Sequence, residues 1–247
     1  MGLSTPSPIV LHAEQEHPRL RFAILALLLL IFALFFFLLR ALFRLAPGDL
    51  PSFALVLACG LAAPLTLGIG WGIETWLKRV WPSGYNLVLN GRTIQVNQPE
   101  LETLTFDLAA GGILLMGWYF ALRGYKRGGR ERRVPDHWLC LACQLQQDDS
   151  RLICYTYAPP TLAENLFHNP AQPVQFYKIN PVEVYGNTLS NPFQAPERPK
   201  TIPTRILNSK DGRFWLAEQR RWTEGLELPL KEFEIFLHYL QTQTGGE

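Results

Sequence analysis

The sequence predicts a membrane-anchored α+β protein, in which a two-helix transmembrane hairpin precedes an antiparallel β-rich domain that ends in an amphipathic helix. Three observations predict this class. Two long apolar runs without a charge lie near the N-terminus, at 22–39 and 53–71. Beyond Pro82, short stretches alternate apolar and polar residues between turn residues, as strands do. The segment 229–243 carries apolar residues at helical spacing.

The two apolar runs are long enough to cross a bilayer. A helix rises about 1.5 Å per residue, so roughly 20 residues span a hydrocarbon core about 30 Å thick. We expect helices at about 22–45 and 52–77, because the two prolines and the glycine of 47–51 break the helix between them. The first run is too long for a cleaved signal peptide. The sequence therefore predicts a transmembrane hairpin within 21–81, preceded by a flexible tail at 1–20.

The second apolar run carries small residues at every fourth position, which places Gly60, Pro64, Gly68 and Gly72 on one side of a helix. In lipid, such a face allows close approach of another helix. Gly60, Gly68 and Gly72 are therefore predicted helix-packing residues. Two interpretations stay open: the face packs on the first helix of the same chain, or it docks a helix of a partner protein.

Tryptophans mark the end of the second predicted helix. Trp71, Trp76 and Trp81 lie close to Lys78 and Arg79. Indole rings prefer the headgroup level of a membrane, so these three tryptophans are predicted interfacial anchors.

A basic run follows at 123–133. Its six cations are Arg123, Lys126, Arg127, Arg130, Arg132 and Arg133. By the positive-inside rule, this run favours a cytoplasmic N-terminus and a cytoplasmic domain at 82–247, in an integral protein of the cytoplasmic membrane. Its glycines predict a mobile loop that contacts anionic lipid headgroups or an acidic patch on a partner. The alternative is a solvated loop that acts only as a topology signal.

Alternating stretches predict the strands of the β-rich domain. The strongest signal is a hairpin at 85–96, because Asn90-Gly91 supplies the positive φ angles of a type I′ turn. The other predictions are a strand at 102–107, a hairpin of 138–145 with 151–157, strands at 174–179 and 182–185, and a hairpin of 204–207 with 213–218. The four prolines of 187–203 predict a loop.

The apolar segment 108–122 has two interpretations. Its 15 uncharged residues would span only about 22 Å as a helix, which falls short of a bilayer and favours a long buried strand. A third membrane helix is the alternative. Two further helices are predicted: a short one from Thr161, where Thr161 and Glu164 form a capping box, and the amphipathic helix at 229–243.

This order of elements resembles that of membrane-anchored bacterial proteins with a pleckstrin-homology-like domain, in which paired membrane helices lead into a segment like 83–89. The resemblance covers residues 20–243 as an order of elements. It implies a small barrel or sandwich capped by a helix, in a bacterial inner membrane, that binds rather than catalyses. The loop at 187–203 and the apolar run at 108–122 depart from that pattern.

Cysteine chemistry is the main enzymatic alternative. Cys140 and Cys143 form a CxxC pair, and Cys154 lies on the predicted facing strand. Three thiols near one another could hold zinc. In a strand, however, residues three apart point to opposite faces, which favours buried core thiols. The sequence has no glycine-rich phosphate loop, serine elbow or paired carboxylates, so we expect no enzyme and no cofactor. The basic run lacks a nucleic-acid recognition element, so no nucleic-acid partner is expected.

These observations predict a non-catalytic, membrane-anchored scaffold or accessory subunit whose β-rich domain binds other components of a membrane protein complex. A sensor that binds anionic lipids through the basic run is the first alternative. A membrane-bound enzyme with a Cys-based metal site is the second.

Overall fold

The structure is a computed structural model that describes residues 7–14, 18–45, 47, 50–99, 101–125, 127–167, 174–186 and 201–244. The chain forms two compact units. One unit, 15–83, contains two long helices. The other, the β-rich unit, joins the segment that ends at Glu14 to everything from Gly84 onward.

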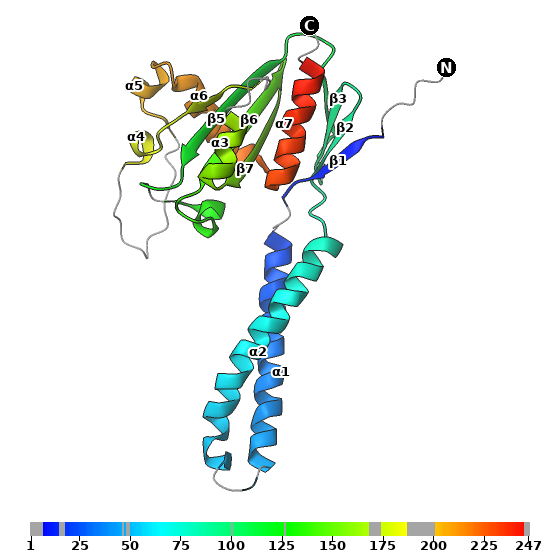
Figure 1. Cartoon of the computed structure of the whole chain (residues 1–247), viewed down its shortest axis with the longest axis vertical. Helices are drawn as coiled ribbons and strands as arrows, with labels where there is room; N and C mark the ends of the chain where they lie inside the picture. The colour runs from blue at the N-terminus through cyan, green and yellow to red at the C-terminus, as the bar shows by residue number, and fades with distance from the viewer. Residues whose placement is uncertain are drawn as a thin grey trace. The chain divides into compact units, whose positions relative to one another are not determined.

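The helical unit consists of α1, Pro18–Leu45, and α2, Leu50–Val80, which run antiparallel side by side (Figure 1). Both helices are long and apolar enough to cross a membrane. The prediction of two long apolar helices near the N-terminus is therefore confirmed. No residue in the most apolar 18-residue window of α1 is buried within the structure.

One side of α2 packs against α1. Its buried residues recur every four positions: Ala54, Ala58, Ala62, Thr66 and Gly70. Gly70 shows how close the helices lie, because a Cβ at this position would collide with the Cδ2 of Leu28. Small side chains thus set the spacing of the pair.

The segment before α1 differs from the flexible tail expected at 1–20. Residues Ile9–His12 form strand β1, which pairs antiparallel with β2, Asn86–Asn90, so that Leu11 faces Leu87. Leu11 and Ala13 are buried in the core. The tail interpretation is wrong for these residues, because a strand of four residues is too short to show a period and its partner lies beyond both helices.

The first sheet is a meander in the order β1-β2-β3-β4, with β3 at Thr93–Asn97 and β4 at Leu104–Asp107. The predicted hairpin at 85–96 and the strand at 102–107 are confirmed. The turn differs from the type I′ prediction, because Asn90 pairs with Thr93 and the loop is Gly91-Arg92. Of these residues only Gly91 has a positive φ, 58°, so glycine is needed at the first loop position alone.

The second sheet has the order β8-β5-β6-β7-β9. Its strands are β5 Leu114–Ala121, β6 Leu139–Gln147, β7 Ser150–Ala158, β8 Phe176–Lys178 and β9 Leu226–Glu227. The inner three pair antiparallel, as predicted, whereas β8 and β9 join in parallel. The strand interpretation of 108–122 therefore holds for 114–121, and this segment is not a third membrane helix.

Three segments predicted as strands are helical. Residues 182–185 form α4, Val182–Tyr185, because the Asn180 side chain accepts the Val182 N–H and Pro181 already has a helical φ of −58°. The expected hairpin of 204–207 with 213–218 is wrong, since these residues lie in α5, Thr204–Leu207, and α6, Gly212–Glu224. The polar Glu218 and Arg221 lie on the buried face of α6 and obscure its helical period.

The remaining helices are α3, Pro160–Phe167, and α7, Leu230–Thr244, with a short 3-10 helix, η1, at Gly129–Arg133. The predicted C-terminal helix is thus confirmed. The α3 helix begins at Pro160, so Thr161 lies inside it and is not its N-cap.

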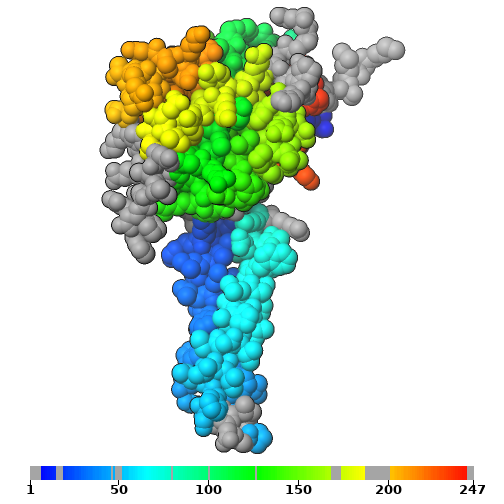
Figure 2. All heavy atoms as spheres, turned by 60° about the vertical axis from the view of Figure 1, so that its left-hand side comes forward, coloured from blue at the N-terminus to red at the C-terminus, as the bar shows by residue number. Residues whose placement is uncertain are grey.

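The second sheet is covered on both faces. One face shares a core with the first sheet, α3 and α7, which contributes Phe233 and Phe236. The opposite face packs on α5 and α6 through Phe214 and Trp215. Figure 1 shows α7 between the two sheets, and Figure 2 shows α5 and α6 (orange) beside the β8–α4 segment (yellow). Burial on both faces explains the nearly continuous apolar run of β6.

Candidate functional site

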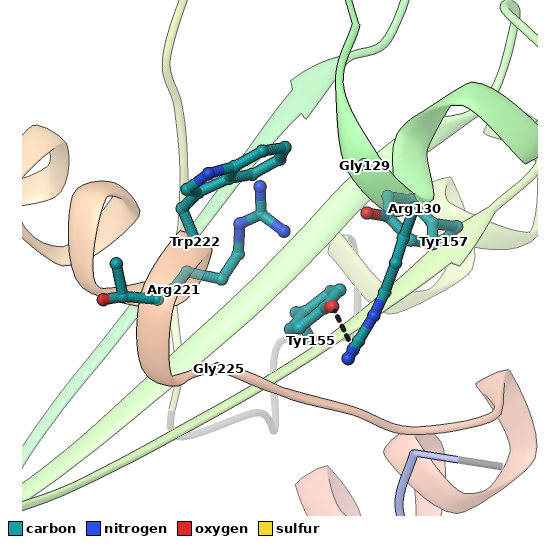
Figure 3. Close-up of a pocket in the computed structure, with 8 residues that line it drawn as sticks. Gly129, Arg130, Tyr155, Tyr157, Arg221, Trp222 and Gly225 are labelled. Carbon is teal, nitrogen blue, oxygen red and sulfur yellow. Dashed lines mark hydrogen bonds between the residues drawn. The ribbon is translucent and has the colours of Figure 1, made fainter. Parts of the chain in front are cut away.

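A small pocket of about 280 Å³ lies where η1, β7 and the end of α6 meet (Figure 3). It combines cationic, aromatic and small residues from segments far apart in the sequence. Its lining residues are Gly129, Arg130, Tyr155, Tyr157, Arg221, Trp222, Thr223 and Gly225.

Arg221 forms the floor of this pocket and is fully enclosed. Its guanidinium donates two hydrogen bonds to Glu218, through Nε and Nη2, each 2.7 Å long. Nη2 also donates to Glu131 Oε1 at 3.1 Å. Both carboxylates are buried. Burial by itself lowers the pKa of Arg221, but attraction and hydrogen bonding from the Glu218 carboxylate help to outweigh it and raise the pKa, so the arginine stays charged.

Aromatic groups complete the surroundings of this charge cluster. The Tyr155 ring lies 4.7 Å from the Arg221 Cζ, a distance at which a ring face attracts a cation. The indole N–H of Trp118 donates to Glu218 Oε2 at 3.0 Å. Each buried carboxylate therefore meets a donor, which is the condition for ionised groups inside a protein.

Arg130 closes one side of the pocket. It donates to the Tyr155 hydroxyl at 2.9 Å (Figure 3). It also pairs with Glu14 and lies 3.5 Å from Glu227 Oε2. Burial opposes its charge, but the hydrogen bond to Glu14 and the nearby charges raise the pKa of Arg130. Glu14 also accepts the backbone N–H of Glu227 at 3.0 Å. Arg130 therefore joins the N-terminal segment to β7 and β9.

The pocket is better suited to holding a hydrogen-bond acceptor than to moving a proton. In the described part of the chain, Nη1 of Arg221 makes no hydrogen bond, and Tyr157 is another lining residue of the pocket. Burial raises the pKa of Tyr155 and of Tyr157, so neither exchanges a proton near neutral pH. Four carboxylates already surround the two guanidinium groups, at Glu14, Glu131, Glu218 and Glu227.

The residues of the predicted basic run differ in their exposure to solvent. Arg123, Arg132 and Arg133 are exposed, whereas Lys126 lies outside the described residues. Arg127 is partly buried and donates to the backbone oxygens of Glu131 and Val134. The expectation of a mobile loop is wrong for Gly129–Arg133, because η1 is held in place when Glu131 enters the core to meet Arg221.

The predicted helix-packing glycines lie away from the α1–α2 contact. A Cβ added at Gly60, Gly68 or Gly72 would meet nothing within 4 Å. The helix pair uses the roughly opposite face of α2 instead, since a shift of two residues turns a helix by about 200°. The predicted anchors Trp71, Trp76 and Trp81 are all exposed.

The cysteines do not converge on a site. Cys143 lies directly opposite Cys154 in the β6–β7 ladder, in the core shared with the first sheet. Cys140 lies in the other core, as the spacing in a strand predicts. Burial raises the pKa of Cys143 to about 12 and also raises the pKa of Cys140 and Cys154. Within the residues described, no three His, Cys, Asp or Glu side chains are grouped to hold a metal ion.

Sequence reasoning missed the cluster around Arg221. Its members come from segments 90 residues apart, at Glu131 and Arg221, so no local spacing reveals them. One signal was present: Glu218 and Arg221 are three residues apart beside Phe214 and Trp215, so a helix there would place an ion pair on its apolar face.

Comparison with protein-family models, curated proteins and solved structures found no match. The fold and the pocket define the chain as a β-rich unit into which an apolar helix pair is inserted. The resemblance to pleckstrin-homology-like proteins stays a prediction.

Proposed function

We propose that this chain is an integral membrane protein that acts as a non-catalytic accessory subunit or scaffold. Helices α1 and α2 cross the membrane, and the β-rich unit binds other components of a membrane protein complex. The observation that carries the proposal is the open face of small residues on α2.

The surface of the helices supports the membrane assignment. Large apolar side chains are exposed along both helices, among them Phe22, Leu29, Leu30, Leu34, Phe37, Leu42, Phe53, Val56 and Leu67. Water is a poor solvent for such a surface, because apolar area costs roughly 25 cal/mol per Å² to expose. A soluble core helix would be mostly buried, whereas the apolar window of α1 is not buried at all.

The topology of the first sheet supports two crossings. Strand β1 precedes α1, strand β2 follows α2, and the two strands pair. The ends of the helix pair therefore lie on the same side of any membrane, as two spans require. The basic run then favours the cytoplasmic side of a bacterial inner membrane for the β-rich unit.

The open glycine face supports a partner within the membrane. Gly68-x-x-x-Gly72 has the spacing at which two helices approach closely in lipid. Because α1 packs on the other side of α2, this face is available to a helix of another protein. An accessory subunit has such a surface, whereas a simple anchor does not need one.

The test combines membrane extraction with substitution of the glycine face. We expect the full chain to resist alkaline carbonate extraction and to co-migrate with other membrane proteins in a mild detergent. Gly68→Leu/Gly72→Leu should abolish the co-migration, while Ala41→Leu, an exposed small-to-large change on α1, should not. A carbonate-soluble chain, or a lone monomer with no specific co-migrating protein, contradicts the proposal.

A second candidate is favoured by the exposure of Arg123, Arg132 and Arg133: a sensor of anionic lipid at the membrane surface. Each cation near an anionic surface gains about 1 kcal/mol. The full chain is placed in nanodiscs of phosphatidylglycerol or of phosphatidylcholine. Replacing all three arginines by alanine should then release the β-rich unit from the surface of the phosphatidylglycerol nanodiscs. The same change should not alter the β-rich unit in the phosphatidylcholine nanodiscs. Equal protease accessibility of the variant and the parent in phosphatidylglycerol excludes this candidate.

A further inference from the structure

A second cavity, of about 470 Å³, lies between α6 and the adjoining ends of β5 and β6. Its volume lies within the range of roughly 300–1,000 Å³ that is usual for ligand sites. Leu114, Met116, Phe214 and Leu216 supply the apolar lining. Leu114 is 55% exposed and Leu216 is 40% exposed. We refer to this cavity as the α6 groove.

Gln144 gives the α6 groove an unused hydrogen-bond acceptor. The side chain is only 2% exposed, lines the groove, and its Oε1 has no hydrogen-bond partner. Its orientation is fixed by a chain of hydrogen bonds. Gln146 Nε2 donates to the Asp148 carbonyl, so Gln146 Oε1 is left to accept from Gln144 Nε2, at 3.3 Å. The free atom is therefore the Gln144 oxygen, and it requires a donor.

Two cations flank the same groove. Arg213 and Arg220 lie on α6 on either side of Leu216 and line the cavity with it. Their spacing of seven residues corresponds to about 10 Å along the helix. Neither forms an ion pair within the described residues. Leaving a buried amide oxygen without a partner is unfavourable, and a ligand that donates to it would remove this cost.

We propose that the α6 groove binds an extended, acidic segment of a partner protein. One backbone N–H of this segment donates to Gln144 Oε1. An apolar side chain packs against Met116 and Leu216, and acidic side chains on either side of it pair with Arg213 and Arg220. An extended chain advances about 3.3 Å per residue, so acidic residues two to four positions apart match the two arginines.

The α6 groove combines groups that one peptide can satisfy together. A phosphodiester alone would pair with the arginines but only accepts hydrogen bonds, so it would leave Gln144 Oε1 without a donor. A peptide brings both an N–H donor and carboxylates. This inference rests on the proposed function, since it names the chemistry of one partner of the β-rich unit.

The test uses the full chain in zwitterionic nanodiscs and a random twelve-residue peptide display library as the probe. We expect the selected peptides to share an apolar residue between acidic ones. Arg213→Glu/Arg220→Glu should weaken their binding by about tenfold or more, because attraction becomes repulsion. Lys178→Glu/Lys231→Glu changes the charge equally at exposed positions outside the groove and should leave the affinity unchanged. Gln144→Met should weaken peptide binding by about two- to tenfold, because it removes one hydrogen bond between neutral groups.

Three results would overturn the inference: selection of no peptide, selection of peptides without acidic residues, or equal binding by the Arg213→Glu/Arg220→Glu variant. Competition by phosphatidylglycerol vesicles but not by free selected peptide would show that the two arginines bind lipid. This result would also overturn the inference. Failure of the proposed function is distinguishable, because a carbonate-soluble chain would refute membrane anchoring without changing peptide affinity.

Discussion

The buried ion cluster depends on every one of its members. Arg221 neutralises Glu131 and Glu218, two carboxylates with almost no contact with water. A complete buried ion pair adds little net stability, because desolvation offsets the attraction. Removing one partner is different, since the remaining charge stays buried without compensation.

Replacing Arg221 by methionine, which keeps most of its volume, should therefore lower the free energy of unfolding of the β-rich unit by about 3–5 kcal/mol. Arg220→Met, one residue earlier and outside the cluster, should change it by no more than about 0.5 kcal/mol. Urea unfolding in detergent, followed by tryptophan fluorescence, measures both, since Trp118 and Trp215 are buried. Equal midpoints for the two variants would mean that the cluster is not buried.

The buried thiols predict a loss of stability at alkaline pH. Burial raises the pKa of Cys143 to about 12, from 9.0 when exposed. Below pH 9 the thiol is neutral in the folded and the unfolded states, and its contribution is fully present. Between about pH 9 and pH 12 only the unfolded state loses the proton, so stability falls by about 1.4 kcal/mol per pH unit for this thiol.

Urea midpoints measured from pH 8 to pH 10.5 should therefore decline, and Cys143→Ala should make the decline shallower. Cys59→Ala, which changes a helix residue outside the β-rich unit, serves as the control and should leave the slope unchanged. A slope that is the same with and without Cys143 would show that this thiol ionises as easily in the folded state.

Secondary-structure elements are predictable from the sequence where the pairing partner is near in the chain. The helix pair, the hairpin of β2 with β3 and the hairpin of β6 with β7 all follow from length or alternation between neighbours. Prediction failed where a distant contact decides the structure. Strand β1 needs β2, and η1 is ordered because Arg221 binds Glu131. Helix α6 was misread because its buried face contains an ion pair.

The two faces of α2 should respond differently when a small side chain is replaced by a larger one. Ala62 is buried against α1, so Ala62→Leu should force the helices apart at a cost of about 1–3 kcal/mol. Ala63 is exposed, and Ala63→Leu should be tolerated. Spin labels at Leu30 and Leu65, on a Cys59→Ser background, report the spacing of α1 and α2 by electron resonance. An unchanged distance in Ala62→Leu would place the contact face elsewhere.

The chain leaves the β-rich unit after β1 and returns to it at β2. The segment before α1 is therefore part of the folded body. Its Leu11 enters the core, and its Glu14 pairs with Arg130. The boundary between the two units thus falls twice in the sequence, which a linear division into tail, hairpin and domain misses.

This arrangement is tested by placing a charge on each side of β1. Leu11→Asp buries an unpaired carboxylate and should destabilise the β-rich unit by about 3–5 kcal/mol. Val10, 46% exposed on the other side of the strand, should accept aspartate with little effect. Thermal unfolding in detergent measures both. If Leu11→Asp were as stable as Val10→Asp, residues 9–12 would be a tail.

The pairing of β1 with β2 also constrains the order of events during synthesis. The first strand leaves the ribosome about seventy-five residues before its partner, and contacts between such distant segments form slowly. Both spans must be translated, and placed in the bilayer if they enter it, before the first sheet can close. Until then Ile9–His12 has an unpaired backbone edge, so the nascent chain is most exposed to mispairing or to a chaperone during this interval.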